Sequence, residues 1–287
     1  MENPKNFSFS GFAKLTRIGN LLIIALAQYM TAIFIIADQN RQYDALTDPK
    51  LFLLSLSSVL IAAAGYIIND YYDVKIDYIN KPNRVVVGKV LKRRVVMVAH
   101  TMINFVGIGL GFLVSPIVAI INFLCALLLW LYSNQLKRMP LAGNLSVALL
   151  TGLSIYIVEI VFRSGNQFVL VYAAFAFGYT VIREIVKDME DVKGDETFGC
   201  KTIPIVYGLR VTKWIILAFS LIFTMSLSAA LISINSDFIT ILIVGNVAML
   251  TMLMVLLYNA DTVKQLHNLS TATKIMMMIG VLSMILI

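Results

Sequence analysis

The stretch NDYYDVKID at Asn69–Asp77 and the stretch DMEDVKGD at Asp188–Asp195 carry the same acidic pattern in an otherwise very apolar chain. Both place three aspartates at positions i, i+3 and i+7: Asp70, Asp73 and Asp77, then Asp188, Asp191 and Asp195. On an α-helix, at about 100° per residue, this spacing keeps three carboxylates within roughly a 60° arc. Each triplet is therefore predicted to lie on one face of a helix and to point at one place.

Six carboxylates gathered around one cleft repel one another unless cations hold them together. Mg²⁺ prefers oxygen ligands and is usually held by one or two carboxylates together with substrate phosphate oxygens and water. The two triplets thus indicate a Mg²⁺ and diphosphate site. The alternative for either triplet alone is a solvated helix end whose acids pair with Lys75 or Lys187; the identical spacing of both triplets argues against it.

The composition is that of an integral membrane protein. Hydrophobic residues make up 59% of the chain, the mean hydropathy is +0.85, and 14% of residues are charged, against about 25% in soluble domains. A helical span needs about 20 apolar residues. Such runs predict an all-α, polytopic protein, a single domain over 1–287, with about nine spans near 18–37, 51–69, 95–114, 117–133, 145–162, 168–186, 214–234, 238–258 and 271–287.

The net charge of +7 is explained by membrane topology and does not indicate nucleic-acid binding. With the N-terminus inside, only Arg41, Lys50 and Arg163 lie on the outer side, which leaves 20 of the 23 Lys and Arg residues on the inner side. Cytoplasmic loops carry such an excess. We therefore expect an inner-membrane protein whose N-terminus and acidic loops are cytoplasmic.

A diphosphate needs basic partners as well as metal. The sequence offers candidates in four cytoplasmic segments: Arg17 with Asn20, Arg84, Lys137 with Arg138, and Lys201. Tyr132 and Asn144 flank the loop between the fourth and fifth spans, although Tyr at a membrane boundary is usually an interfacial anchor. Glu159 is an ionisable residue inside a span, and hence a functional candidate; Arg163 is the partner that the sequence suggests.

At these residues the chain resembles the UbiA superfamily of intramembrane prenyltransferases. The pattern Asn69-Asp70-x-x-Asp73-x-x-x-Asp77 is similar to the first aspartate-rich motif of that family, and Asp188-x-x-Asp191-x-x-x-Asp195 to the second. The stretches YSNQLKR, GNLSVALLTG, REIVKDMEDVKGD and KTIPI resemble the branch that transfers a geranylgeranyl group to geranylgeranylglyceryl phosphate in ether-lipid synthesis.

The resemblance implies helices around a central cavity with a cytoplasmic-side cap, an isoprenyl diphosphate donor and a lipophilic acceptor. It implies metal ligands at Asn69, Asp70, Asp73, Asp77, Asp188, Asp191 and Asp195. Among these, Asp73, Asp77, Asp191 and Asp195 are expected to be catalytic, and Arg17, Asn20, Arg84, Tyr132, Lys137, Arg138, Asn144 and Lys201 to bind substrate.

Three alternatives stay open. Prenylation of an aromatic quinone precursor such as 4-hydroxybenzoate needs only one carboxylate contact from the acceptor. A cation-coupled transporter should place ionisable groups near the bilayer midplane, whereas these acids cluster at helix ends. A CDP-alcohol phosphotransferase also uses aspartates and Mg²⁺, but the Asp-Gly and Ala-Arg pairs expected in its acidic motif are missing here.

Overall fold

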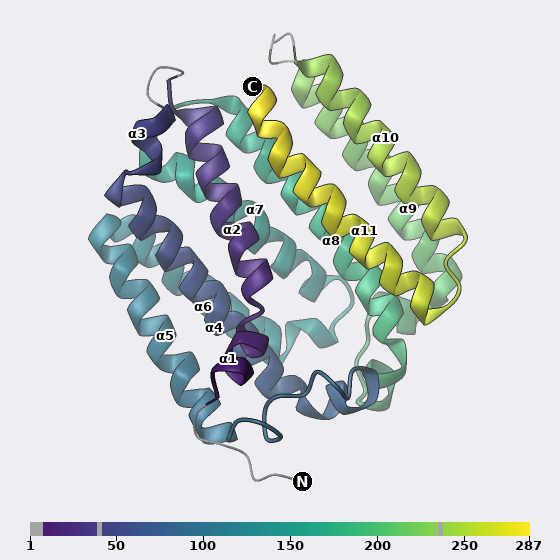
Figure 1. Ribbon diagram of the computed structural model, residues 1–287. Coiled ribbons are helices and arrows are strands. Elements are labelled where there is room, and N and C mark those ends of the chain that lie inside the picture. Colours follow the sequence, from purple (N-terminus) through teal and green to yellow (C-terminus); the bar gives the residue numbers. More distant parts are fainter. Residues whose placement is uncertain (1–7, 39–41, 233, 235–237) are drawn as a thin grey trace.

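The computed structural model describes residues 8–38, 42–232, 234 and 238–287, and these are almost entirely helical (Figure 1). Arg41, one of the three basic residues expected on the outer side, lies outside the described residues. The elements are α1 (Phe9–Thr16), α2 (Ile18–Met30) continued by the π-helical turn η1 (Thr31–Ile36), α3 (Gln42–Leu46), α4 (Pro49–Asn80), α5 (Arg93–Val114), α6 (Pro116–Asn134), the 3₁₀ turn η3 (Leu136–Arg138), α7 (Ala142–Phe162), α8 (Gln167–Thr197), α9 (Ile203–Ile232), α10 (Ile239–Tyr258), α11 (Val263–Leu282) and the 3₁₀ turn η4 (Ser283–Leu286).

Nine helices in the described part of the chain are long and apolar enough to cross a membrane, which confirms the predicted all-α, polytopic fold. One difference lies in the last span, which begins at Val263 and not near 271. Thr262 and Gln265 form a capping box there, each side chain bonding the backbone of the other. Because a capping box favours a helix start regardless of the polarity of the turn that follows, the helix begins in a segment that hydropathy does not mark.

The outer surface of the bundle is apolar. Phe105, Trp214 and Met225 expose 71%, 63% and 72% of their surface, as expected for side chains that face lipid rather than water. By contrast, 78% of the most apolar 18-residue stretch of α8 is buried inside the protein, which is the largest share of any span in the described part of the chain. The second acidic motif is therefore carried by the most enclosed helix.

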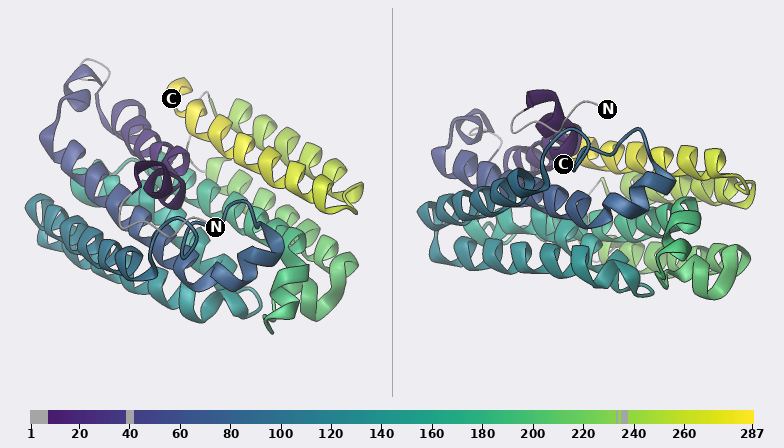
Figure 2. Two further views of the ribbon diagram at one scale, coloured as in Figure 1. Left: turned by 60° about the horizontal axis from the view of Figure 1, so that its bottom comes forward. Right: turned by 90° about the horizontal axis from the view of Figure 1, so that it is seen from below.

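The long helices form a ring (Figures 1 and 2), and side chains of α2, α4, α6, α7, α8 and α11 line a cavity within it. The first motif helix, α4, packs along α5 and α6, and the second, α8, packs along α7, α9 and α11. The first span, α2, contacts α4, α7 and α11 and so joins the two groups. As a result α9 and α10 lie outside the ring, beyond α8 and α11 (Figure 1).

A cap covers the end of the bundle where α4 ends. The segment 81–92 between α4 and α5 turns back on itself, with a backbone bridge between Val87 and Leu91 and Gly88 at a φ of +80°. A small apolar cluster attaches it to α1 and α4; its buried members are Leu15, Ile67, Val86, Val87, Leu91 and Val96. This cluster holds α1 across the end of α4 and fixes the residue that follows α1, Arg17.

Candidate active site

The first acidic motif lies on the last turns of α4 and faces basic residues from two other segments. Arg17 donates from Nη2 to Asp70 Oδ1 at 2.7 Å, and Lys137 of η3 forms an ion pair with Asp73. Arg17 also lies over the Tyr66 ring, 5.0 Å from its centroid. It links α1 to α2 in the left-handed conformation, with φ of 53°, and this break in the helix aims its side chain at α4.

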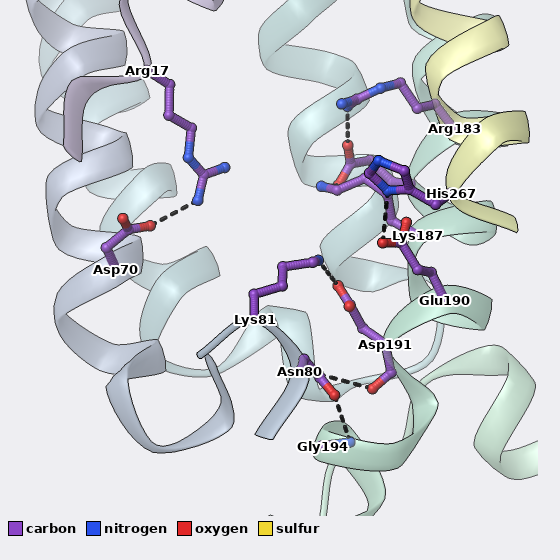
Figure 3. Close-up of polar contacts among 11 residues, drawn as sticks. Arg17, Asp70, Asn80, Lys81, Arg183, Lys187, Glu190, Asp191, Gly194 and His267 are labelled. Atoms are coloured by element: carbon purple, nitrogen blue, oxygen red, sulfur yellow. Dashed lines mark hydrogen bonds and ion pairs between the residues drawn. The ribbon is translucent and has the colours of Figure 1, made fainter. Parts of the chain in front are cut away.

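The second motif lies on the last turns of α8. Asn144 of α7 donates from Nδ2 to Asp188 Oδ2 at 2.8 Å. Lys81, the residue after α4, donates from Nζ to Asp191 Oδ2 at 2.6 Å (Figure 3). Asp195 is near enough to Asp73 for the two carboxylates to repel each other. The two motifs, more than a hundred residues apart in sequence, thus face one another.

A single asparagine fastens the two motif helices together. Asn80, the last residue of α4, donates from Nδ2 to the carbonyl of Asp191 at 3.0 Å and accepts from the Gly194 N–H at 2.9 Å (Figure 3). Gly194 lies within α8, which continues to Thr197. This contact requires glycine, because a Cβ at this position would come within 2.5 Å of the Asn80 amide.

Beside the motifs, a cavity of about 270 Å³ reaches into the bundle. Its polar end includes Arg17, Asn20, Asn69 and Tyr132 among the predicted site residues, and its interior is lined by aliphatic side chains of α2, α4, α6 and α7. Asn20 donates to the Tyr66 hydroxyl at 3.2 Å. An apolar interior with a polar mouth suits an amphiphile with a long hydrocarbon tail.

Five predicted substrate-binding residues do not line this cavity. Lys137 and Asn144 contact the motif carboxylates of Asp73 and Asp188 instead. The other three, Arg84, Arg138 and Lys201, are exposed. Two of them are adjacent through the backbone, because Lys201 N–H donates to the Arg138 carbonyl at 2.8 Å. This bond holds the loop after α8 against η3, the turn that carries Lys137.

The environment affects two titratable groups in the loops. Burial lowers the pKa of the Arg17 guanidinium, but the Asp70 carboxylate, together with Tyr66 and Asp77, outweighs burial and raises this pKa above its usual value. Burial raises the pKa of the Cys200 thiol, and the Asp195 carboxylate adds to this effect. Arg17 therefore keeps its positive charge, whereas Cys200 is a neutral thiol at neutral pH and not a metal-binding thiolate.

The oxygen atoms of the two motifs are suitable ligands for Mg²⁺. In the described part of the chain no three His, Cys, Asp or Glu side chains form a ready metal cage. Mg²⁺ does not require one, since substrate phosphate oxygens and water usually complete its shell. One buried acceptor is also unused: Asn69 Oδ1 has no hydrogen-bond partner among these residues and lies in the cavity wall. Carboxylate and amide oxygens from both motifs thus fit Mg²⁺ ions completed by a diphosphate.

Several polar residues at the site were not singled out from the sequence. These are Lys81, which pairs with Asp191, and three cavity-lining side chains, Arg183, Glu184 and Lys274. The sequence suggests Lys187, which also lines the cavity, only as a partner for the acids of a solvated helix end. The sequence does contain a signal for Arg183 and Glu184. Both fall inside the predicted span 168–186, and ionisable residues within a span are functional candidates.

The presence of the ionisable residue Glu159 in a span is explained by its contacts in the turn that follows α7. Its carboxylate accepts hydrogen bonds from the Ser164 hydroxyl and from the Gly165 N–H, the latter at 2.7 Å. These are its partners in the structure, in place of the suggested Arg163, which turns into the left-handed conformation with φ of 52°. Glu159 therefore stabilises the turn between α7 and α8, at the end of the bundle away from the aspartates.

The fold and the facing aspartate motifs define an integral membrane enzyme that handles a diphosphate inside a helical bundle. The model of the UbiA prenyltransferase family matches residues 22–277. The chain belongs to this family and is a prenyltransferase.

Curated relatives and solved structures agree. The chain is 34% identical over 280 residues to digeranylgeranylglyceryl phosphate synthase of Methanobrevibacter smithii, covering 94% of each chain, and 36% identical over 211 residues to that of Sulfurisphaera tokodaii, covering 73% of each. A solved structure of digeranylgeranylglyceryl phosphate synthase matches with a TM-score of 0.71 and 25% identity, covering 96% of this chain and 97% of that one. A UbiA homologue from Archaeoglobus fulgidus bound to GPP and Mg²⁺ shares the fold, with a TM-score of 0.72, 15% identity, and 96% and 100% coverage.

Proposed function

We propose that this enzyme transfers a geranylgeranyl group from geranylgeranyl diphosphate to the hydroxyl of geranylgeranylglyceryl phosphate, with Mg²⁺ as cofactor. The observation that carries the proposal is the identity of 34% to a digeranylgeranylglyceryl phosphate synthase over 94% of both chains. The cavity supports it independently, because its lining is largely apolar and includes Asn69 of the first motif and Lys187, the residue before the second motif.

In the proposed site, the chain positions a diphosphate between two acidic helix ends. Carboxylates of Asp70, Asp73 and Asp77, with Asn69, would hold one Mg²⁺, and those of Asp188, Asp191 and Asp195 a second. Bound Mg²⁺ stabilises negative charge on a departing diphosphate.

Basic residues complete the binding of the donor head group. The ammonium groups of Lys137 and Lys81 already reach into the space between the motifs, where they contact Asp73 and Asp191. The Arg17 guanidinium contacts Asp70 from the mouth of the cavity. Each can donate charge-assisted hydrogen bonds to phosphate oxygens, which are stronger than hydrogen bonds between neutral groups.

The cavity provides the setting for the chemical step. When the allylic C–O bond breaks, the diphosphate leaves with the electron pair and the allyl group carries a positive charge. Aliphatic side chains such as Ile61, Leu129 and Leu150 line the cavity and exclude water, and the Tyr66 and Tyr132 rings lie near its mouth. An acceptor hydroxyl then forms the new C–O bond and gives up its proton, so the product is an ether.

The orientation is part of the proposal. Among the Lys and Arg residues in the described part of the chain, Lys50 and Arg163 lie at the end of the bundle opposite the aspartates. By the positive-inside bias we place the N-terminus and both motif ends at the cytoplasmic side of the inner membrane. The donor and Mg²⁺ would then be drawn from the cytoplasm.

The acceptor is tested with the purified full-length protein in nanodiscs. Geranylgeranyl diphosphate and Mg²⁺ are supplied with either geranylgeranylglyceryl phosphate or 4-hydroxybenzoate, and products are identified by mass spectrometry. We expect the diether phosphate from the first acceptor and nothing from the second. Prenylation of the aromatic acceptor alone would refute the proposed acceptor and leave the family membership intact.

A further inference from the structure

A second group of basic side chains lines the cavity, apart from the aspartate motifs. It consists of Arg183 and Lys187 on α8 and Lys274 on α11 (Figure 3 shows the first two), and we call it the basic cluster. Arg183 Nη1 and Lys187 Nζ each contact the Glu184 carboxylate at 2.8 Å. Lys274 Nζ donates to Asn20 Oδ1 at 2.7 Å. All three cations come from membrane-spanning helices, where unneeded charge is costly.

The charges of the basic cluster do not balance. Glu184 is the only carboxylate among the residues that line the cavity, and it serves two cations, Arg183 and Lys187. The partner of Lys274 is a neutral amide. Among the side chains of this part of the cavity wall, three positive charges against one negative charge leave an excess of about two. The neighbouring Asp188 carboxylate does not line the cavity and accepts a hydrogen bond from Asn144. A purely structural ion-pair network inside a bundle would be expected to be neutral, because unpaired buried charge is strongly unfavourable.

Two buried polar atoms in the cavity wall near the basic cluster also have unused hydrogen-bonding capacity. Arg183 Nε and Thr180 Oγ1 are buried and have no partner within the described ranges. Thr180 is only 3% exposed, and both residues line the cavity. Buried polar groups are nearly always paired. A ligand with several acceptor oxygens would satisfy both groups at once.

The basic cluster begins beside the donor site and extends deeper into the bundle. Lys187 directly precedes Asp188, the first aspartate of the second motif, and Arg183 precedes Asp188 by five residues, which corresponds to about 8 Å along a helix at 1.5 Å per residue. A diphosphate held between the ends of α4 and α8 does not need cations at that depth. Cations at that depth are needed by a second anionic group, one that belongs to a molecule whose reacting atom lies beside the donor carbon.

We infer that Arg183, Lys187 and Lys274 form the subsite that binds the phosphate of the acceptor lipid; the inference rests on the proposed function. A phosphate monoester carries about −1.5 to −2 charges at pH 7 and three acceptor oxygens, which match the excess charge and the unpaired donors. The glycerol hydroxyl is separated from this phosphate by a few bonds only. Holding the phosphate here therefore presents the hydroxyl to the donor carbon between the cluster and the aspartates.

The test compares lipid binding by the wild-type chain and by Arg183→Gln and Lys274→Gln in nanodiscs. Titration calorimetry measures the affinities for geranylgeranylglyceryl phosphate, for geranylgeranylglycerol, which lacks the phosphate, and for geranylgeranyl thiodiphosphate with Mg²⁺, a donor analogue that resists ionisation. Lys264→Gln is the matched control, because Lys264 lies on the same helix as Lys274, is exposed, and is not part of the cavity wall. Lys274→Gln is the milder change, since Glu184 keeps both of its partners.

The wild type and Lys264→Gln should bind the phosphorylated acceptor at least about tenfold more tightly than the alcohol. Each cluster variant should lower that ratio about tenfold, the effect of one charge-assisted hydrogen bond, with donor binding unchanged. A folded Lys274→Gln protein that keeps the wild-type ratio, or that weakens donor binding instead, overturns the subsite alone. A wild type that binds both acceptors equally contradicts the proposed acceptor and the subsite together.

Discussion

The contact between Asn80 and Gly194 makes a strong prediction for Gly194→Ala. The added Cβ would lie within 2.5 Å of the Asn80 amide, so this side chain must move and lose its bonds to the Asp191 carbonyl and the Gly194 N–H. At about 0.5–1.5 kcal/mol per hydrogen bond, the loss amounts to about 1–3 kcal/mol. Ala is better than Gly in a helix by about 1 kcal/mol, which offsets part of this loss.

The control for this change is Gly109→Ala on α5. Gly109 is also helical, and a Cβ there meets nothing within 4 Å, so this variant receives only the helix-propensity gain. The two variants should differ by about 1–3 kcal/mol in free energy of unfolding, measured in detergent by thermal or denaturant unfolding. Gly194→Ala should also lower kcat about 10- to 100-fold, because a misplacement of about 1 Å at a reacting site has effects of that size.

A double-mutant cycle tests whether the contact between Asn80 and Gly194 causes the loss of stability. With Asn80→Ala already present, the side chain that Gly194→Ala would displace is gone, so the second substitution should be neutral or slightly stabilising. Strong non-additivity of this kind is expected only for residues in direct contact. Equal destabilisation by Gly194→Ala in both backgrounds, or wild-type stability and kcat in the single variant, would refute the role given to this contact.

Three further predictions concern the site and its orientation. Asp73→Ala and Asp191→Ala should each lower kcat by about 10²-fold or more while the protein still folds, because several kcal/mol of transition-state stabilisation is lost; near wild-type diphosphate release in either would contradict the two-motif site. Chelation with EDTA should stop prenyl transfer and added Mg²⁺ should restore it, and turnover that persists after chelation would argue against the metal. Lys193→Cys, with Cys125 and Cys200 replaced by serine, should react with an impermeant maleimide only from the cytoplasmic side of sealed vesicles, and labelling from outside would reverse the proposed topology.

The fold was largely predictable because the lipid environment makes hydropathy informative. Each apolar run of about 20 residues must form a helix to satisfy its backbone in the membrane, and nine such helices are found among the described residues. The start of the last span was missed by hydropathy, since its first turns include Lys264 and His267 and only the cap at Thr262 marks it. The spacing of the aspartates, in turn, indicated the two acidic faces before any contact was known.

Pairings across the site were not predictable in the same way. That Lys81 meets Asp191, or that Lys274 reaches Asn20 from the other end of the chain, depends on which helices become neighbours. Single-sequence patterns describe one helix at a time. Lys137 and Arg138 illustrate the limit, because they are adjacent in sequence, yet Lys137 contacts Asp73 while Arg138 is exposed.

Two pairs of helices are joined by very short segments at the end of the bundle away from the aspartates. There, α5 and α6 are joined by Ser115 alone, and α7 and α8 by residues 163–166, whose turn Glu159 stabilises. By comparison, the segment 81–92 between α4 and α5 at the aspartate end is longer. Because each short segment holds its two helices together at one end, the two helices of each pair can separate only at the other end. Any separation within these two pairs is thereby directed to the end where the head groups of the substrates must enter and leave.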